Sequence, residues 1–225
     1  MGFGRRIQYF LVHTLKYTNK EAKALITERR VRVGSKIIDS NIELNDSDEI
    51  TVDGKLVKKH APVYLKYYKP VGFVSSLNAN VKDSLFEVFK DHLPLIIAGR
   101  LDKASEGLLI LTNDGKWAKQ VTDPKNHKEK EYIVKVSKEI DQSFADKMSA
   151  GVDIGFYFTK PCKCWVIDEF TFGIVLTEGK NKQIRRMCKA LGYQVTFLKR
   201  IRIDNFNIDN QVVGSFEVLK KQNVL

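Results

Sequence analysis

The chain has 225 residues, of which 43% are hydrophobic, and its 38 Lys and Arg exceed its 27 Asp and Glu to give a formal net charge of +11. This length supports one good hydrophobic core and a second, smaller one. No apolar stretch is long enough to span a bilayer, the N-terminus lacks the apolar core of a secretory signal, and three cysteines are too few for a disulfide framework. We therefore expect a soluble, cytoplasmic, globular protein with reduced thiols, and the surplus of positive charge favours a polyanionic partner.

Residues 1–52 are predicted to form a small domain of their own. Ile7, Phe10, Leu11 and Leu15 recur at helical spacing, and Thr18-Asn19-Lys20-Glu21 has the capping pattern that starts a second helix. Two short strands around Gly34-Ser35 predict a hairpin, and residues 49–52 predict a further strand. Residues 53–62 are polar and basic without periodic apolar positions, so we predict a linker there.

Residues 63–225 are predicted to form a larger domain that mixes strands and helices. Apolar runs and alternating patterns predict strands at 63–68, 73–76, 108–111, 133–136, 162–167, 173–177, 195–198, 199–203 and 216–219. Helical periodicity predicts helices at 84–89, 116–121, 144–150 and 183–191. The sequence Lys69-Pro70-Val71-Gly72 breaks the first of these strands, because Pro and Gly favour a turn.

The stretch from Gly99 to Gly115 places one acidic residue, Asp102, on a loop that leads into a buried strand. A rigid strand can hold such a loop so that its carboxylate is directed at a ligand. Asp is also common in turns and as a helix cap, because its side chain hydrogen-bonds the local backbone. The residues alone leave both interpretations of Asp102 open.

A strongly basic segment runs from residue 176 to residue 202 and carries eight Lys and Arg against one acid, Glu178. A solvated helix face usually mixes signs, so this segment favours a contact with polyanions. Arg185 and Arg186 project to different sides of the predicted helix, so one can enter a cleft while the other faces an RNA backbone. Lys199, Arg200 and Arg202 are expected to line one face of a strand. The two cysteines of the Cys162-Lys163-Cys164 stretch are not expected to bind zinc, because no further converging ligands are visible.

Several motifs occur together in the order that is typical of one enzyme family. They are Thr18-Asn19-Lys20-Glu21-Ala22 between two helices, Lys69-Pro70-Val71-Gly72, Gly99-Arg100-Leu101-Asp102, Lys130-Glu131-Tyr132, and Glu178-Gly179 followed by Gln183-Ile184-Arg185-Arg186. With them the chain resembles the RsuA-like family of ribosomal RNA pseudouridine synthases, and residues 148–152 and 159–163 are most like the large-subunit RluF type. The first motif resembles the S4 RNA-binding domain, which commonly has Ser-Arg-Arg-Glu-Ala there. Lys20 keeps the charge of the Arg but loses its bidentate fork, which lowers the expected phosphate affinity.

The resemblance implies an α+β fold in which a small S4-like domain is joined to a catalytic domain with a mixed, largely antiparallel sheet. It implies site-specific isomerisation of uridine to pseudouridine in ribosomal RNA, of the large subunit rather than the small one, by a monomer without cofactor or metal. An assembling ribosomal subunit or transfer RNA is a further candidate partner, and no membrane is involved. The implied catalytic residues are Asp102, Arg185 paired with it, and Tyr132 stacked on the flipped uracil, with Leu176 as a further apolar wall. The expected RNA-binding residues are Lys20, Lys23, Arg29, Arg30, Lys69, Arg100, Lys130, Lys180, Lys182 and Arg186.

Some alternatives stay open at this stage. Family chemistry gives Asp102 either a nucleophilic role or the removal of a ribose proton, and the sequence does not choose between them. A non-catalytic ribosome-assembly factor would use the same basic surfaces without needing Asp102, Tyr132 and Arg185 together. A hydrolytic nuclease would ordinarily need a carboxylate cluster for metal ions.

Overall fold

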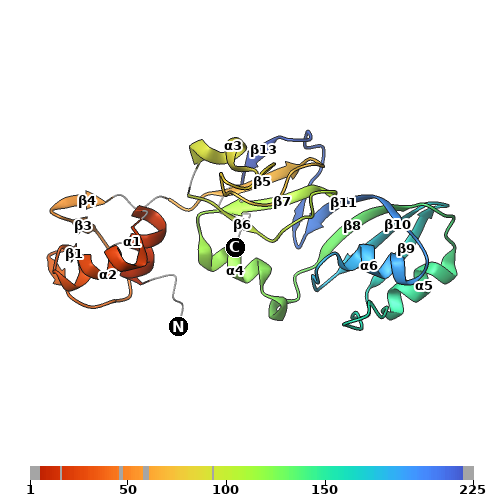
Figure 1. Ribbon diagram of the computed structural model, residues 1–225, viewed down its shortest axis with the longest axis horizontal. Coiled ribbons are helices and arrows are strands. Elements are labelled where there is room, and N and C mark those ends of the chain that lie inside the picture. The colour runs from red at the N-terminus through yellow and green to blue at the C-terminus, as the bar shows by residue number, and fades with distance from the viewer. Residues whose placement is uncertain (1–5, 16, 46–47, 58–60, 93, 220–225) are drawn as a thin grey trace. The chain divides into compact units, whose positions relative to one another are not determined.

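A computed structural model of the chain describes residues 6–15, 17–45, 48–57, 61–92 and 94–219 (Figure 1). The chain divides into two compact units, Met1–Pro62 with Asn113–Lys116, and Val63–Thr112 with Trp117–Leu225. Over the described ranges, no helix combines the length and the apolar character that crossing a membrane requires.

The first unit contains two helices and a four-stranded antiparallel sheet of order β2-β1-β3-β4. Its elements are α1 (Ile7–Leu15), α2 (Asn19–Thr27), β1 (Val31–Val33), β2 (Lys36–Ile38), β3 (Ile50–Val52) and β4 (Lys55–Val57). The predicted capping box is confirmed, because the Glu21 N–H donates to Thr18 Oγ at 3.2 Å and the Thr18 N–H donates to Glu21 Oε2 at 2.7 Å. The predicted hairpin is confirmed as β1 and β2.

We predicted that the first domain ends at residue 52 and that residues 53–62 form a linker. The structure corrects this prediction, because Lys55–Val57 form strand β4 of the first unit's sheet. This strand pairs with β3, so that Val52 lies opposite Lys55. Asp53 and Gly54 between them have φ of 51° and 74°, as a tight two-residue hairpin turn requires. The Asp-Gly pair is therefore a hairpin signal that we read as the start of a linker. Residues 58–60 of the predicted linker lie outside the described residues.

The second unit is built on one sheet of order β13-β5-β7-β11-β8-β10-β9, with β6 paired to β7 and β12 paired to β11. Its strands are β5 (Tyr64–Lys69), β6 (Ile96–Ala98), β7 (Glu106–Thr112), β8 (Lys130–Val136), β9 (Lys163–Asp168), β10 (Thr171–Leu176), β11 (Val195–Ile203), β12 (Phe206–Asn207) and β13 (Phe216–Val218). Its helices are α3 (Phe86–Phe89), η2 (Lys90–His92), α4 (Gly115–Thr122), η3 (Pro124–Asn126), α5 (Gln142–Ala150) and α6 (Gln183–Ala190). Strands β7 and β11 run parallel, and the other described pairs are antiparallel, which confirms the expected mixed sheet.

Three details of this unit differ from the predictions. Residues 73–76 form no strand and contribute only an isolated bridge, Val74 to Ser84. The two strands expected at 195–198 and 199–203 are one continuous strand, β11. Strands β6 and β12, of three and two residues, were not predicted.

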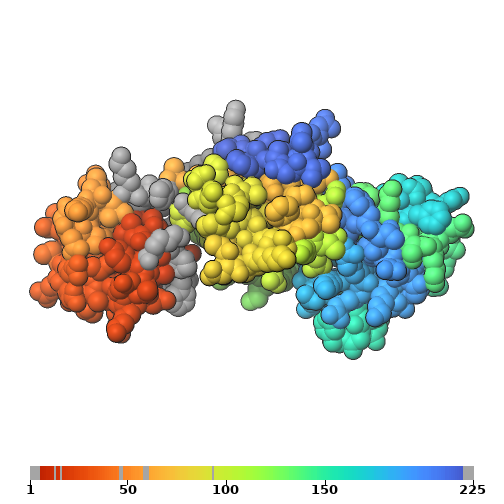
Figure 2. All heavy atoms as spheres, turned by 45° about the horizontal axis from the view of Figure 1, so that its top comes forward, coloured from red at the N-terminus to blue at the C-terminus, as the bar shows by residue number. Residues whose placement is uncertain are grey.

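Both faces of the sheet are covered. Leu109, Leu111 and Val134 belong to one apolar cluster, whereas Leu108 and Ile110 belong to a second cluster on the other face. In Figure 2 the last described residues, in dark blue, lie against the yellow and yellow-green segment that contains α3, where Phe216 packs on Phe89 with ring centroids 5.6 Å apart. The long apolar run of β7 is therefore buried on both sides, as its sequence predicts.

Gly107 permits the parallel contact at the centre of this sheet. A Cβ atom at this position would lie 2.2 Å from the Arg200 backbone oxygen, and its φ of 111° is one that other residues rarely adopt. The missing side chain lets β11 approach the start of β7, immediately after the loop that carries Asp102.

Candidate active site

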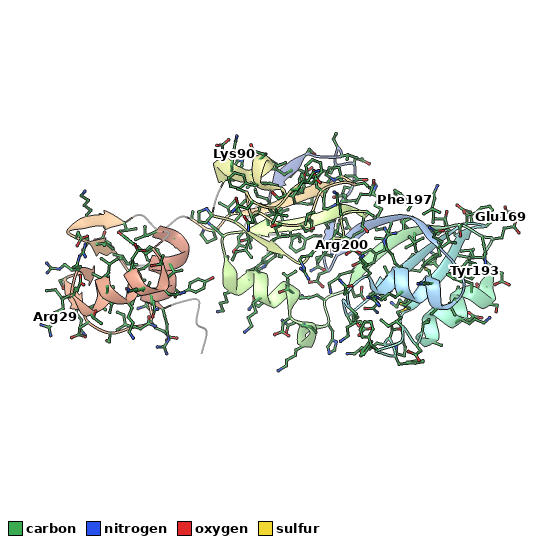
Figure 3. All side chains as sticks on the ribbon, in the orientation of Figure 1. Arg29, Lys90, Glu169, Tyr193, Phe197 and Arg200 are labelled. Atoms are coloured by element: carbon green, nitrogen blue, oxygen red, sulfur yellow. The ribbon has the colours of Figure 1, made fainter. Side chains whose placement is uncertain are left out.

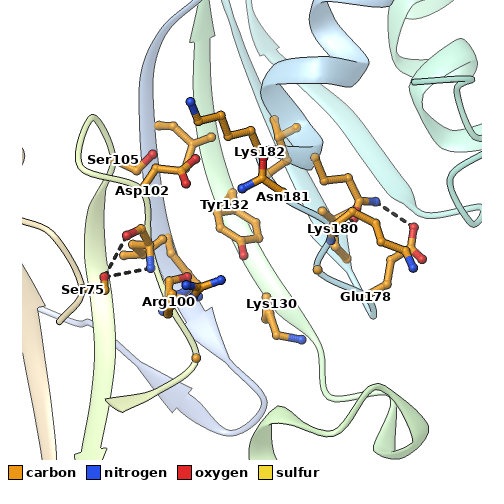
Figure 4. A pocket seen from close by; sticks show the side chains of 18 of the residues that line it. Ser75, Arg100, Asp102, Ser105, Lys130, Tyr132, Glu178, Lys180, Asn181 and Lys182 are labelled. Carbon is orange, nitrogen blue, oxygen red and sulfur yellow. Dashed lines mark hydrogen bonds between the residues drawn. The ribbon is translucent and has the colours of Figure 1, made fainter. Parts of the chain in front are cut away.

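A pocket of about 450 Å³ opens in the second unit, where the loop before β7, strand β8 and the segment between β10 and α6 meet (Figure 4). This volume is in the range of small-molecule binding sites. The predicted site residues that line it are Arg100, Asp102, Lys130, Tyr132, Leu176, Lys180, Lys182 and Arg185. Segments that are far apart in the sequence thus meet at one cavity.

Asp102 lies half-buried on the wall of this pocket, and its loop is fixed by backbone hydrogen bonds. Ser75 Oγ donates to the Leu101 carbonyl at 2.8 Å and accepts from the Leu101 N–H at 3.0 Å, as the dashed lines in Figure 4 show. The Ser105 N–H donates to the Asp102 carbonyl at 3.0 Å. The loop is therefore held on both sides of the carboxylate.

Lys69 contacts the same loop, and its prediction as an RNA-binding residue is wrong. Its side chain is fully buried, and Nζ donates to the carbonyls of Ser105 at 2.7 Å and Pro70 at 2.8 Å. Burial lowers the pKa of Lys69 to about 8, although the carboxylates of Asp102 and Glu106 partly oppose this shift. An ammonium group without solvent access has no route to an RNA phosphate, so Lys69 supports the loop instead.

Arg185 also binds the Asp102 loop, but not in the way we expected. Its guanidinium donates to the Ala104 carbonyl at 2.8 Å, to Ser105 Oγ at 3.2 Å and to the Val195 carbonyl at 3.3 Å. The predicted ion pair with Asp102 is absent from the contacts of the described residues, since α6 directs the guanidinium to acceptors just after the carboxylate. The carboxylate of Asp102 consequently has no hydrogen-bond or ion-pair partner in the described part of the chain.

Tyr132 provides the aromatic wall of the pocket. It lies on β8, opposite Ile174 of β10 and Arg200 of β11, and only 9% of the residue is exposed. Figure 4 shows its ring at the centre of the labelled side chains, with Asp102 and Arg100 on one side and Lys180 on the other. A flat apolar face and an unpaired carboxylate therefore share one cavity.

The predicted cations of the pocket differ in their exposure. Arg100, Lys180 and Lys182 are exposed at the rim and so remain accessible to phosphate groups. Lys130 is half-buried and donates to the Lys128 carbonyl at 2.9 Å, and burial together with the nearby Arg200 charge lowers its pKa. Three rim cations therefore surround the opening, while Lys130 lies deeper.

Lys199, Arg200 and Arg202 were expected to line one face of a strand, but Arg200 and Arg202 are engaged within the protein and do not present an open face to polyanions. Arg200 is only 2% exposed, and its Nε donates to the Leu108 carbonyl at 2.8 Å, within the second unit's sheet (Figure 3). Arg202 donates to Glu131 at 2.7 Å and to Glu129 at 2.9 Å. These side chains join strands to one another, because each finds acceptors on the neighbouring elements.

The remaining predicted RNA-binding residues lie on exposed surfaces. Lys20, Lys23, Arg29 and Arg30 are exposed in the first unit. Arg30 makes a bidentate contact with Asp53 at 2.7 and 2.8 Å, whereas Arg29 lies 3.6 Å from Asp39. Arg186 is exposed on α6 in the second unit and does not line the pocket.

Several residues that shape the pocket were not assigned a role from the sequence. Glu178 is buried and accepts from the Tyr157 hydroxyl at 2.8 Å, the Lys160 N–H at 3.0 Å and Gln183 Nε2 at 2.8 Å. Glu178 and Gln183 belong to the recognised motif, which was the available signal for them. Ser75 had no such signal, because a serine in a short apolar run indicates nothing about its partners.

A search for metal ligands among the described residues finds no group of three or more His, Cys, Asp and Glu that is arranged to hold a metal ion. The free cysteines Cys162, Cys164 and Cys188 have pKa values raised by burial, to about 11 for the first and about 12 for the other two. These thiols therefore stay protonated at neutral pH.

Comparison with known proteins connects this geometry to a family. A family model described as RNA pseudouridylate synthase matches residues 63–190. An uncharacterized RNA pseudouridine synthase of Aquifex aeolicus is 36% identical, over 97% of this chain and 94% of that protein. The dual-specificity RNA pseudouridine synthase RluF of Escherichia coli K12 is 35% identical, over 90% and 71%, and ribosomal large subunit pseudouridine synthase B of Bacillus subtilis is 33% identical, over 87% and 84%.

A solved structure gives the same result for the fold. A crystal structure described as pseudouridylate synthase covers 97% of this chain and 97% of its own, with a TM-score of 0.68 and 27% sequence identity. The matched family region contains Asp102, Tyr132 and Arg185, so these three pocket residues lie in the part of the chain on which the assignment rests. The chain belongs to the RNA pseudouridylate synthase family, among the RsuA-like enzymes that include RluF and the large-subunit synthase B.

Proposed function

We propose that this enzyme converts a specific uridine of large-subunit ribosomal RNA to pseudouridine, with Asp102 as its catalytic carboxylate. One observation carries the proposal: an unpaired carboxylate and the ring of Tyr132 line the same pocket in a member of this family. The reaction breaks the bond from uracil N1 to ribose C1′, forms a bond from uracil C5 to C1′, and exchanges the C5 proton for one on N1. It therefore requires no net oxidation and no group donor.

The pocket supports a division of roles between its residues. The uridine leaves the RNA helix and its base lies against Tyr132, since enzymes that act on a base extrude it from the stack. The ionised carboxylate of Asp102 then acts as a nucleophile or removes a ribose proton. Ser75, Lys69 and Arg185 act as positioning residues, because their hydrogen bonds restrict where the Asp102 loop places that carboxylate.

The cations supply affinity for the RNA backbone. Arg100, Lys180 and Lys182 surround the pocket opening, and phosphate contacts from such residues dominate nucleic-acid affinity. In the first unit, exposed Lys20, Lys23 and Arg29 contact structured RNA in the manner of an S4-like domain. The name of the Bacillus subtilis relative, a large-subunit synthase that is 33% identical, supports a large-subunit substrate. A relative named ribosomal small subunit pseudouridine synthase A has a lower identity, 29%.

Asp102→Asn tests the proposal, with Asp91→Asn as a matched control on the exposed helix η2. Each protein is incubated with unmodified 23S and 16S ribosomal RNA transcripts, and pseudouridines are mapped in both. We expect the wild type and Asp91→Asn to modify 23S RNA, and Asp102→Asn to bind RNA equally well but to form no product. Retained turnover in Asp102→Asn contradicts the assignment of the carboxylate.

The same samples separate the proposal from two other functions. A non-catalytic ribosome-assembly factor would form no pseudouridine in any variant. A metal-dependent nuclease would cleave the transcripts and would lose this activity in EDTA, because it relies on bound metal ions. We expect intact RNA, and we expect pseudouridine formation to continue in EDTA.

A further inference from the structure

Residues 153–158 form a tight hairpin beside the pocket, here called the aromatic hairpin. Asp153 and Phe158 form a β-bridge, and the Ile154 N–H donates to the Tyr157 carbonyl at 3.0 Å. Gly155 has a φ of 95° at the first central position, which places Phe156 at the tip of the turn. The resemblance discussed above assigned no role to these residues.

The aromatic hairpin exposes two large apolar rings. Phe156 is 61% exposed and Phe158 is 63% exposed, whereas Tyr157 between them is half-buried. Neither Phe belongs to an apolar cluster of the described residues, so the folded core does not require either ring at its position. Adjacent exposed rings of this kind are typical of a surface that binds something.

Cations lie over two rings of the aromatic hairpin, those of Phe156 and Tyr157. The Arg186 guanidinium lies 5.0 Å from the centroid of the Phe156 ring, and Lys180 Nζ lies 4.2 Å from that of Tyr157. The acids nearby are engaged by hydrogen bonds: Asp153 accepts from the Gly155 N–H at 2.8 Å, and the buried Glu178 accepts from Tyr157 and two other donors. The exposed charges around the rings are those of Lys180, Arg186 and Asp153, which leaves a net positive charge.

The hairpin is connected to the active site by these contacts. Lys180 and Glu178 both line the pocket, and both touch Tyr157, which is next to the hairpin tip. Figure 4 shows Lys180 and Glu178 on the side of the pocket opposite Asp102. A strand that leaves the pocket along this side passes Lys180 and then reaches the hairpin that carries the exposed Phe156.

We propose that the aromatic hairpin is a stacking platform for unpaired nucleotides of the RNA substrate that flank the target uridine. Phe156 stacks on a base, and Arg186 and Lys180 contact the adjoining phosphates, since rings combined with cations are the common recognition mode for single strands. This inference rests on the proposed function, because the same RNA occupies both sites. The inference assigns to Phe156 a role in affinity for the flanking nucleotides, with no part in the reaction itself.

The test measures binding of a fluorescein-labelled single strand of 12 uridines by fluorescence anisotropy. We expect Phe156→Ala to weaken binding by at least about fivefold, because base stacking on one ring has roughly that value or more. Phe156→Trp retains a ring and should restore binding to near the wild-type level. Phe170→Ala is the matched control, because Phe170 is also exposed, at 41%, but lies on the β9–β10 turn.

A second probe reads stacking directly in the wild-type protein. A 12-nucleotide strand with 2-aminopurine at alternate positions should lose fluorescence on binding the wild type and lose much less on binding Phe156→Leu. Equal affinities for Phe156→Ala and Phe170→Ala, or equal quenching by the wild type and Phe156→Leu, would overturn the proposal. Weaker binding by Phe156→Ala in a protein that forms no pseudouridine would support the platform while contradicting the proposed function.

Discussion

Replacement of the buried Lys69 by Met should change how the stability of the protein depends on pH. The Met side chain has a similar length but no charge, so it occupies the space of the lysine without its proton. In the folded protein the pKa of Lys69 is about 8, whereas its ordinary value in an unfolded chain is 10.5. Between these values the unfolded state binds more protons than the folded state, so the stability of the wild type rises with pH.

The size of the effect follows from the two pKa values. From pH 7 to pH 10 the titration of Lys69 should raise the free energy of unfolding of the wild type by about 2 to 3 kcal/mol relative to Lys69→Met. Cysteines and tyrosines also titrate in this range, and their contribution cancels because both proteins contain them. Lys69→Met should in addition turn over more slowly, because the Ser105 and Pro70 carbonyls lose their donor.

The assay is urea unfolding of both proteins at pH 7, 8, 9 and 10, followed by tryptophan fluorescence. The informative quantity is the free energy of unfolding of the wild type minus that of Lys69→Met at each pH, which we expect to rise with pH. A difference that stays constant from pH 7 to pH 10 would refute the idea that Lys69 is held in the fold with a depressed pKa. A difference that falls as pH rises would show that an acidic partner stabilises the ammonium instead.

Five further substitutions, at Gly107, Gly179, Arg185 and Tyr132, test other parts of the structure. Gly107→Ala should prevent folding, because its Cβ would lie 2.2 Å from the Arg200 backbone oxygen. Gly179→Ala has open space around its Cβ and should show the thermal unfolding of the wild type in circular dichroism. Equal melting temperatures of Gly107→Ala and the wild type would contradict this reasoning. Arg185→Lys should lower kcat by about 10-fold to 100-fold with little change in KM, because Lys lacks the fork that holds the Asp102 loop, and an unchanged kcat would show that this anchor is dispensable. Tyr132→Phe should retain most of its turnover and Tyr132→Leu should lose about 1–3 kcal/mol of substrate binding, and equal loss in both would point to the hydroxyl rather than the ring.

The sequence was informative where the signal is local. The capping box at Thr18 and Glu21 and the hairpin at Gly34-Ser35 involve residues that contact one another within a few positions, so their patterns predicted the structure correctly. The Asp53-Gly54 turn carried an equally local signal, but the basic residues after it concealed the short strand β4. The family motifs predicted that Asp102, Tyr132 and Arg185 would lie close together, and all three line the pocket, whereas Lys69 and Arg186 do not.

The sequence was less informative about burial and about partners. Lys69 and Arg200 look like RNA-binding cations in the sequence, and only the fold reveals that they are buried and bound to backbone carbonyls. Likewise, the direction in which α6 leaves its loop decides whether the Arg185 guanidinium donates to the Asp102 carboxylate or to the Ala104 carbonyl. No periodicity encodes these outcomes, because they depend on contacts between segments about 30 to 90 residues apart.

The parallel contact of β7 with β11 has a consequence for the time at which the enzyme becomes competent. Arg200 donates to the Leu108 carbonyl across 92 positions, so this contact cannot form until the segment that carries Arg200 has left the ribosome. Until then the first unit is complete and displays its cations, while the loop of Asp102 lacks the strand that supports it. In a nascent chain the first unit can therefore fold before the Asp102 loop gains the strand that supports it.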